Sequence, residues 1–229
     1  MFVPLHDDTP LRVIRFQFVT LAIIAANVVI FLMTGAFAGE QAVEAVAAGF
    51  GVVPAELTRA IRLDPSLNPV PEPATLITYM FLHAGWLHLL SNMLFLWVFA
   101  DNVEDAFGHF AFLLFYLLTG IAGGLTHVLM APASPAPLIG ASGAVSGVIA
   151  AYMLLYPKAR IWILLFMRLP IRIGAIWVLG GWFALQVLSL LLTGEDDVQV
   201  AWWAHIGGFF AGLAITFLLR SKLLMRIGD

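Results

Sequence analysis

The stretch GASGAVSGVIAAYMLLYP, residues 140–157, decides the fold of this chain. It is apolar, but a helix from Ser142 to Tyr156 spans only ~22 Å at 1.5 Å per residue, whereas the hydrocarbon core of a bilayer is ~30 Å thick. The start of this helix must therefore lie below a membrane surface. The proline-rich linker 131–138 would lead the chain down to it, and non-helical backbone is tolerated at that depth only beside protein or water. The pattern predicts a buried, wet pocket at Ser142.

Composition places the whole chain in a membrane. Hydrophobic residues make up 62% of the 229 residues and charged residues 11%, with a mean hydropathy of +0.97. A soluble globular protein does not need that much apolar surface. The chain has no cysteine, which excludes disulfides, thiolate chemistry and cysteine-ligated metals. We predict no cofactor, no metal and no nucleic-acid partner.

Apolar segments of helical length recur along the chain. Apart from the fourth, each is near the ~20 residues that cross a bilayer. We predict an all-α membrane protein with one domain, 1–229, whose six transmembrane helices include a short fourth helix that starts inside the membrane. The outer loop 35–85 should contain short amphipathic helices at the interface. The predicted helices are 16–34, 86–103, 110–130, 142–156, 171–193 and 201–219.

Basic residues set the orientation. Nine of the 11 Lys and Arg residues fall on one side of the predicted helices, and the positive-inside rule makes that side cytoplasmic, with both termini. They are Arg12, Arg15, Lys158, Arg160, Arg168, Arg172, Arg220, Lys222 and Arg226. The first apolar run resembles a signal peptide, but its length of about 19 residues favours an uncleaved anchor. We predict an integral multi-pass protein of a prokaryotic cell (inner) membrane.

The second, fourth and sixth helices then all start on the outer side. Their first two turns carry the polar side chains His88, Asn92, Ser142 and His205, which should converge in the outer part of the membrane. Polar side chains at such a depth are expensive and mark a functional site by default. The topology therefore predicts a site that opens to the outer side.

Ser142 and His205 form a candidate nucleophile and base. A packing role for Ser142 is the alternative, because Gly143, Gly147 and Ala151 form a stripe of small residues. Its place at a helix N-terminus favours catalysis, since free N–H groups there can stabilise an oxyanion. Gly208 and Gly212 would let the sixth helix approach closely. No carboxylate lies at comparable depth, so the pattern predicts a dyad rather than a triad.

His88 and Asn92 are spaced i and i+4 and share one helix face. Both carry N–H groups that can polarise a scissile carbonyl, which is the oxyanion-hole role. A metal site made of His83, His88 and His205 is the alternative. It lacks any acidic or sulfur ligand nearby and is disfavoured.

These motifs together resemble a rhomboid intramembrane serine protease of the compact six-helix, prokaryotic type. The resemblance runs from residue 75 to 215 in the family's order. It rests on Phe81-Leu82-His83-Ala84-Gly85-Trp86-Leu87-His88 with Asn92, on Glu104 with Gly108, on Gly140-Ala141-Ser142-Gly143, and on Ala204-His205-Ile206-Gly207-Gly208 with Gly212.

The resemblance implies a role for each of these residues. Ser142 would be the nucleophile and His205 the base, and His88, Asn92 and the Ser142 N–H would bind the oxyanion. Glu104 and Gly108 would organise the turn after the second helix, and the fifth helix with the acidic loop 194–199 would gate substrate entry. The chain has Thr78-Tyr79 where many members carry an arginine, and Ser146 where many carry an aromatic residue that stacks on the imidazole.

The expected function is hydrolysis of peptide bonds in or near transmembrane segments of other membrane proteins, with the bilayer as the medium. A catalytically silent binder of transmembrane helices is the main alternative, and the presence of both Ser142 and His205 argues against it. A solute transporter is disfavoured because the two halves of the chain share no repeat.

Overall fold

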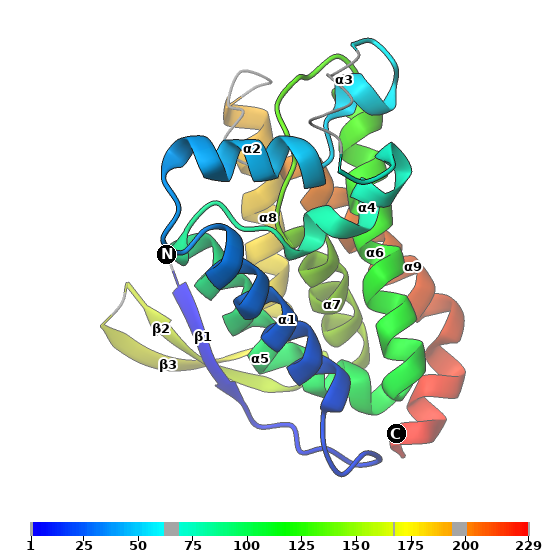
Figure 1. Cartoon of the computed structure of the whole chain (residues 1–229). Coiled ribbons are helices and arrows are strands. Elements are labelled where there is room, and N and C mark those ends of the chain that lie inside the picture. Colours follow the sequence, from blue (N-terminus) through cyan, green and yellow to red (C-terminus); the bar gives the residue numbers. More distant parts are fainter. Residues whose placement is uncertain (1, 62–68, 167, 194–200, 229) are drawn as a thin grey trace.

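Apolar helices surround the short helix α7 (Ser142–Leu155) in the computed structural model, which describes residues 2–61, 69–166, 168–193 and 201–228 (Figure 1). The helix α7 packs against four of its neighbours, α5, α6, α8 and α9. The long helices are α1 (Phe18–Thr34), α5 (Trp86–Phe107), α6 (His109–Met130), α8 (Ala175–Thr193) and α9 (Trp202–Ile227).

Each of the six predicted segments contains a helix, with shifted ends. The helices α5 and α9 run on to Phe107 and Ile227, past the predicted ends at 103 and 219. By length and composition, α6, α8 and α9 can each cross a membrane. A fourth candidate span is the pair Glu72–Phe81 and α5, bent by 82°, whereas α1 and α7 are shorter apolar helices.

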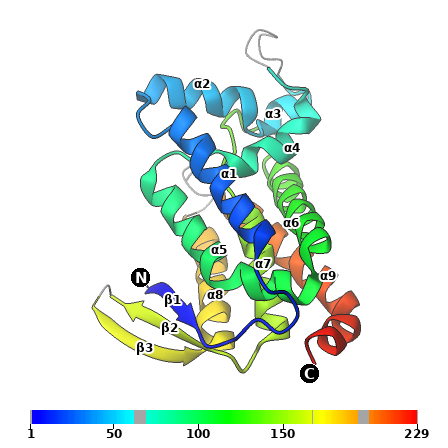
Figure 2. The same cartoon turned by 60° about the horizontal axis from the view of Figure 1, so that its bottom comes forward.

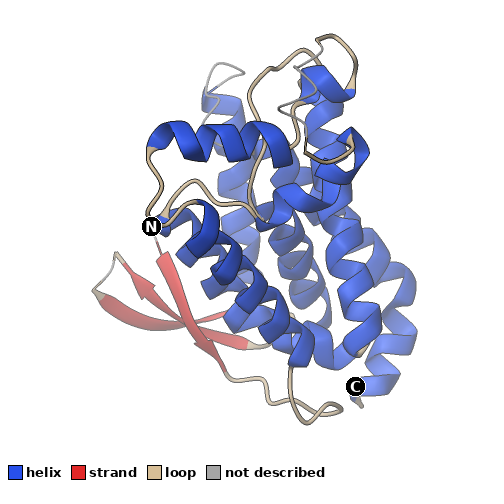
Figure 3. Cartoon of the chain, viewed as in Figure 1, coloured by secondary structure: helices blue, strands red, loops and turns tan. Residues whose placement is uncertain are grey.

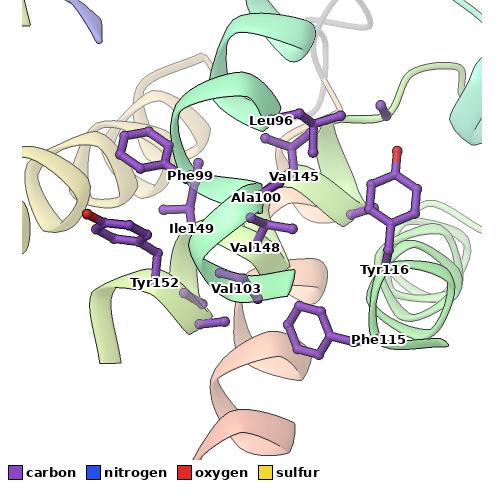
Figure 4. Packing of buried hydrophobic residues seen from close by; sticks show 14 of the residues in the cluster. Leu96, Phe99, Ala100, Val103, Phe115, Tyr116, Val145, Val148, Ile149 and Tyr152 are labelled. Carbon is purple, nitrogen blue, oxygen red and sulfur yellow. The ribbon is translucent and has the colours of Figure 1, made fainter. Parts of the chain in front are cut away.

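The core lies between α5, α6 and α7. Figure 4 shows Phe99 and Val103 of α5 over Val148 and Ile149 of α7, with Tyr116 of α6 beside them. Every residue of the stretch 143–152 is buried. A helix that is apolar on all sides is stable only when other elements enclose it, so the composition of α7 explains its central place.

Glycines bring α7 and α9 into backbone contact. A Cβ atom on Gly208 would lie 1.9 Å from the Gly143 carbonyl oxygen, and one on Gly212 would lie 2.4 Å from that of Gly147. Both distances are too short for any side chain. The stripe of small residues on α7 therefore packs against the glycines of α9, as the sequence pattern suggests.

The chain is mostly helical, but a three-stranded sheet was not predicted (Figure 3). Its strands, in the order β1-β2-β3, are β1 (Phe2–Asp7), β2 (Arg160–Leu165) and β3 (Leu169–Gly174), all antiparallel. The fifth predicted helix therefore starts at Ala175 rather than at 171.

Alternating buried and exposed residues explain why β2 is a strand. In β2, Ile161 and Ile163 are buried while Arg160 and Trp162 are exposed, which is the period of two that strands require. The buried isoleucines pair with Ile173 and Ile171 of β3. Pro170 is compatible with β3 because β3 is an edge strand.

The loop 35–85 contains the short helices that the sequence predicts. They are α2 (Glu40–Phe50), α3 (Pro54–Leu57), η2 (Glu72–Ala74), α4 (Thr75–Thr78) and η3 (Tyr79–Phe81). The helices α2 and α3 lie at the end of the bundle opposite the sheet (Figure 2). A β-bridge between Val52 and Leu138 joins this loop to the linker before α7.

Candidate active site

The side chains of Ser142 and His205 form a hydrogen bond. His205 Nε2 lies 2.8 Å from Ser142 Oγ, although 63 positions separate the two residues. Ser142 is the first residue of α7, and His205 lies in the first turn of α9. The close packing of α7 against α9 therefore brings together the two residues that the sequence singled out.

The backbone before Ser142 requires glycine. Gly140 has a φ of +125°, which L side chains rarely adopt. A Cβ atom there would lie 2.6 Å from His88 Nε2 and 3.7 Å from Ser142 Oγ. Glycine thus leaves room for the His88 ring to come close to the start of α7.

The first turn of α7 has free N–H groups. The residue before it is Ala141, and no side chain caps this helix end. Because the first N–H groups of a helix have no partner within it, the N–H of Ser142 is available to a ligand. The positive end of the helix dipole lies at the same place.

The ring of His88 is oriented by its own turn. The Ala84 N–H points at His88 Nδ1 over 3.5 Å, and the His83 ring packs edge-on against it with 4.9 Å between the centroids. If Nδ1 accepts, the proton of the neutral ring resides on Nε2, the atom next to Gly140. In that tautomer, His88 can donate a hydrogen bond beside Ser142.

Asn92 lies one turn further along α5. It is buried, and its Nδ2 donates to the His88 carbonyl oxygen over 2.9 Å. An amide group has a second N–H, for which the structure shows no partner among the described residues.

Gln186 was missed by the sequence reasoning. Its Oε1 lies 2.8 Å from His205 Nδ1, on the side of the ring opposite Ser142. It belongs to α8, which carries none of the four polar residues that the sequence singled out and was expected to gate substrate entry. A signal existed, because an amide in the middle of an apolar helix is expensive in a membrane.

Two tryptophans flank the imidazole of His205. The ring centroid of Trp182 lies 6.2 Å away and that of Trp202 lies 6.0 Å away. They provide the aromatic surroundings that Ser146 does not, since the Ser146 hydroxyl donates to the Ser142 carbonyl oxygen instead, over 2.7 Å.

Tyr79 fastens the linker that precedes Ser142. Its carbonyl accepts from the Gly140 N–H over 2.9 Å, and its hydroxyl donates to the Gly120 carbonyl oxygen over 2.6 Å. This loop lacks the arginine that many family members carry, and the fully buried Tyr79 holds it in place instead.

Glu104 joins three helices at the other end of α5. Its fully buried carboxylate accepts from the N–H groups of Val19 (3.0 Å) and Thr20 (2.7 Å) at the start of α1, and it lies 2.5 Å from His109 Nδ1 of α6. Gly108 follows with a φ of +81°, and a Cβ atom there would lie 2.8 Å from Arg226 Nη2.

Within the part of the chain that the structure describes, no three His, Asp or Glu side chains gather as metal ligands do. The acidic loop 194–199, predicted to take part in gating, lies outside the described residues.

A comparison with known families tests the resemblance. The model of the rhomboid domain matches residues 70–222, which is more than half of the chain and contains every residue of the site. The chain belongs to the rhomboid family. It is an integral membrane protein, as its apolar helices also indicate.

Several curated proteins are similar to this rhomboid. Rhomboid-like protein 11, chloroplastic, of Arabidopsis thaliana is 45% identical over 74 residues, which cover 32% of the chain and 26% of the relative. RHOMBOID-like protein 6, mitochondrial, of the same plant is 31% identical over 147 residues (64% and 44%). Rhomboid protease GluP of Bacillus subtilis (strain 168) is 33% identical over 141 residues (61% and 25%). The matched region thus spans less than half of each of these three relatives.

Proposed function

We propose that this rhomboid is an intramembrane serine endopeptidase that uses Ser142 and His205 as a dyad. The observation that carries the proposal is the 2.8 Å hydrogen bond from the Ser142 hydroxyl to His205 Nε2 at an uncapped helix N-terminus. Nucleophile, base and oxyanion donors then lie within one site, which is the arrangement that acyl transfer requires.

The geometry supports the following reaction. Ser142 Oγ attacks the scissile carbonyl carbon as its proton passes to His205 Nε2. The carbonyl oxygen becomes an oxyanion and accepts hydrogen bonds from the Ser142 N–H, His88 Nε2–H and the free N–H of Asn92. The protonated His205 then donates its proton to the leaving amine. Water, activated by the same ring, hydrolyses the acyl-enzyme and regenerates Ser142.

The substrates we propose are transmembrane segments of other membrane proteins. A helical substrate uses its carbonyl groups in its own hydrogen bonds, so the segment must unwind locally before Ser142 can attack. The peptide enters sideways from the lipid between α5 and α8. Water reaches Ser142 from the membrane surface nearest to it.

We further propose six membrane spans, with α1 and α7 as the short ones, in a prokaryotic cell membrane. The positive-inside rule, applied to the nine basic residues on one side, favours a cytoplasmic location for the sheet and both termini, and the site would then open to the opposite side. Basic residues of β2 and β3 such as Arg160 and Arg172 support this orientation.

Purified protein in lipid, incubated with a transmembrane substrate, tests the proposal. Wild type should release two fragments, and Ser142→Ala and His205→Ala should release none while they keep the thermal stability of wild type. Ser91→Ala is the matched control, because the Ser91 hydroxyl is exposed and bonds only its own helix. Cleavage that persists in folded Ser142→Ala would refute the dyad. Helix binding without cleavage by wild type would instead indicate a silent binder.

A further inference from the structure

The catalytic imidazole has a second partner, which the proposed dyad does not include. His205 Nδ1 lies 2.8 Å from Gln186 Oε1, and His205 Nε2 lies 2.8 Å from Ser142 Oγ. Both nitrogens of the ring are therefore occupied, each by a different helix. The dyad chemistry described above assigns no task to Gln186.

The orientation of the Gln186 amide follows from its own helix. Its Nε2 lies 3.5 Å from the Trp182 carbonyl oxygen, one turn earlier in α8. An N–H can donate to that oxygen, whereas a flipped amide would set two acceptors against each other. The oxygen of the amide therefore faces His205.

An acceptor at Nδ1 fixes the tautomer of the neutral imidazole. The ring has one proton, and it must reside on Nδ1 to donate to Gln186 Oε1. Nε2 is then unprotonated and accepts from the Ser142 hydroxyl, which is the direction that a general base needs. With the other tautomer, Nε2–H would point at Ser142 Oγ and could not take its proton.

We propose that Gln186 is a positioning residue that holds His205 in the Nδ1–H tautomer and makes the base depend on the place of α8. The inference rests on the proposed protease function. It adds a neutral amide where soluble serine proteases use a carboxylate. The amide fixes the ring without a buried negative charge, which is expensive inside a membrane.

The packing of α8 gives this bond a second consequence. Only 17% of the apolar stretch of α8 is buried, whereas the corresponding share is 44% for α6 and 33% for α9. Of the three helices that can each cross a membrane alone, the least enclosed one thus carries the acceptor for the base. When α8 moves aside for a substrate, His205 loses its hydrogen bond to Gln186. The Nδ1–H tautomer of His205 is then restored only after α8 returns against α9.

Two other ionisable side chains lie close enough to His205 to interact with it electrostatically, but neither replaces Gln186. They are His88 of α5 and His127 of α6, and both are imidazoles rather than carboxylates. Ser142 on α7 is the remaining polar neighbour. Among the described residues that face the ring, Gln186 provides the acceptor for Nδ1.

Kinetics of full-length protein in lipid provide the first test. Gln186→Leu should lower kcat about 10- to 1000-fold with KM unchanged, a smaller loss than the ~10⁴-fold effect of replacing a triad aspartate, because an amide stabilises the imidazolium less. Gln186→Glu keeps an acceptor. It should recover most of the activity, with the acid limb of the kcat/KM profile moved to higher pH.

Gln41→Leu is the matched control for the chemical change, because Gln41 is exposed on α2. Leu185→Ala is the control for α8 itself, since Leu185 is exposed on that helix. Both should keep the kcat and pH profile of wild type. Wild-type kinetics in folded Gln186→Leu would overturn the inference, as would equal losses of kcat in Gln186→Leu and Gln186→Glu.

Nitrogen-15 NMR of histidine-labelled protein in lipid provides a test that needs no proteolysis. The His205 signals, assigned by their loss in His205→Ala, should show Nδ1 protonated in wild type and a shift toward Nε2–H in Gln186→Leu. An Nε2–H tautomer in wild type would overturn the inference. If wild type shows the Nδ1–H tautomer but cleaves no substrate, the proposed function fails and the positioning by Gln186 stands.

Discussion

A Cβ atom on Gly208 would lie 1.9 Å from the carbonyl oxygen of Gly143, the residue that follows the candidate nucleophile. The backbones of α9 and α7 are therefore in direct contact beside the dyad. Any side chain at Gly208 must push the two helices apart and separate His205 from Ser142. Stability and the proposed catalysis thus depend on the same contact.

We expect Gly208→Ala to destabilise the protein by about 3 kcal/mol, the upper part of the usual range for overpacking, and Gly208→Val to do so further. Gly181→Ala is the matched control, because a Cβ atom at Gly181 of α8 meets nothing within 4 Å. It should leave stability unchanged or raise it by about 0.5–1 kcal/mol, since alanine favours a helix. Thermal unfolding in lipid measures both. Equal unfolding temperatures for the two alanine variants would contradict the packing described here.

The proposed oxyanion donors give a kinetic prediction. His88→Ala and Asn92→Ala should each lower kcat about 10- to 1000-fold, as expected for the loss of one oxyanion donor. Steady-state cleavage of a transmembrane substrate measures the effect. His6→Ala is the matched control, because His6 is exposed in β1, and it should behave as wild type. Unchanged rates in both site variants would place the oxyanion elsewhere.

Glu104→Ala should destabilise the fold by about 3 kcal/mol, because it leaves the N–H groups of Val19 and Thr20 without their acceptor. Glu44→Ala on the exposed face of α2 is the matched control and should have little effect. Thermal unfolding of the two variants decides the matter. A stable Glu104→Ala protein would show that water replaces the carboxylate at the start of α1.

Lateral entry between α5 and α8 predicts the effect of a crosslink. The rings of Phe95 and Trp182 are 5.9 Å apart across these helices, and the chain has no cysteine of its own. Cysteines at both positions, joined by a short reducible thiol crosslinker, should block cleavage of a transmembrane substrate. Reduction should restore it to the level of the uncrosslinked double variant.

A small fluorophosphonate probe separates blocked entry from a damaged site. It reaches Ser142 through water and should label the crosslinked and reduced proteins at the same rate. If the crosslinked enzyme cleaved the full substrate as fast as the reduced one, entry between α5 and α8 would be wrong.

Asp7 makes stability depend on pH. Burial raises the pKa of its carboxyl above the usual range, against the opposing effect of hydrogen bonds from Tyr152 and Thr9. A raised pKa means that the folded state binds the proton more tightly, so this contribution is complete at low pH and is lost as pH rises through the folded pKa. Asp7→Asn keeps an acceptor for the Tyr152 hydroxyl but does not titrate. Its stability relative to wild type should therefore increase with pH.

Thermal unfolding of both proteins across pH 4–8 measures this difference. Glu44→Gln, which removes an exposed carboxyl on α2, is the control for the change in net charge. A difference between Asp7→Asn and wild type that stays constant with pH would contradict the raised pKa.

The sequence by itself determined where the helices lie and which residues meet at their ends. Long apolar runs identify helices through local composition. Because successive membrane helices run in opposite directions, α5, α7 and α9 all start on the same side of the membrane. That was enough to predict that Ser142, His205 and His88 converge, as the structure shows. The alternation of apolar and polar residues in β2 was a signal for the sheet. The high apolar content of residues 160–174, however, is as typical of a membrane helix as of a strand.

Only the tertiary structure decided which side chains surround Ser142 and His205. Gln186 and Trp182 meet His205 because α8 turns one particular face toward α9. Which face it turns depends on packing, such as the stacking of the Phe183 ring on the Phe209 ring, whose centroids are 3.8 Å apart. Helical periodicity fixes which residues share a face of one helix, but not which face meets a neighbour. The same limit hid the contact of Glu104 with α1, since nothing local to α5 indicates that another helix begins beside it.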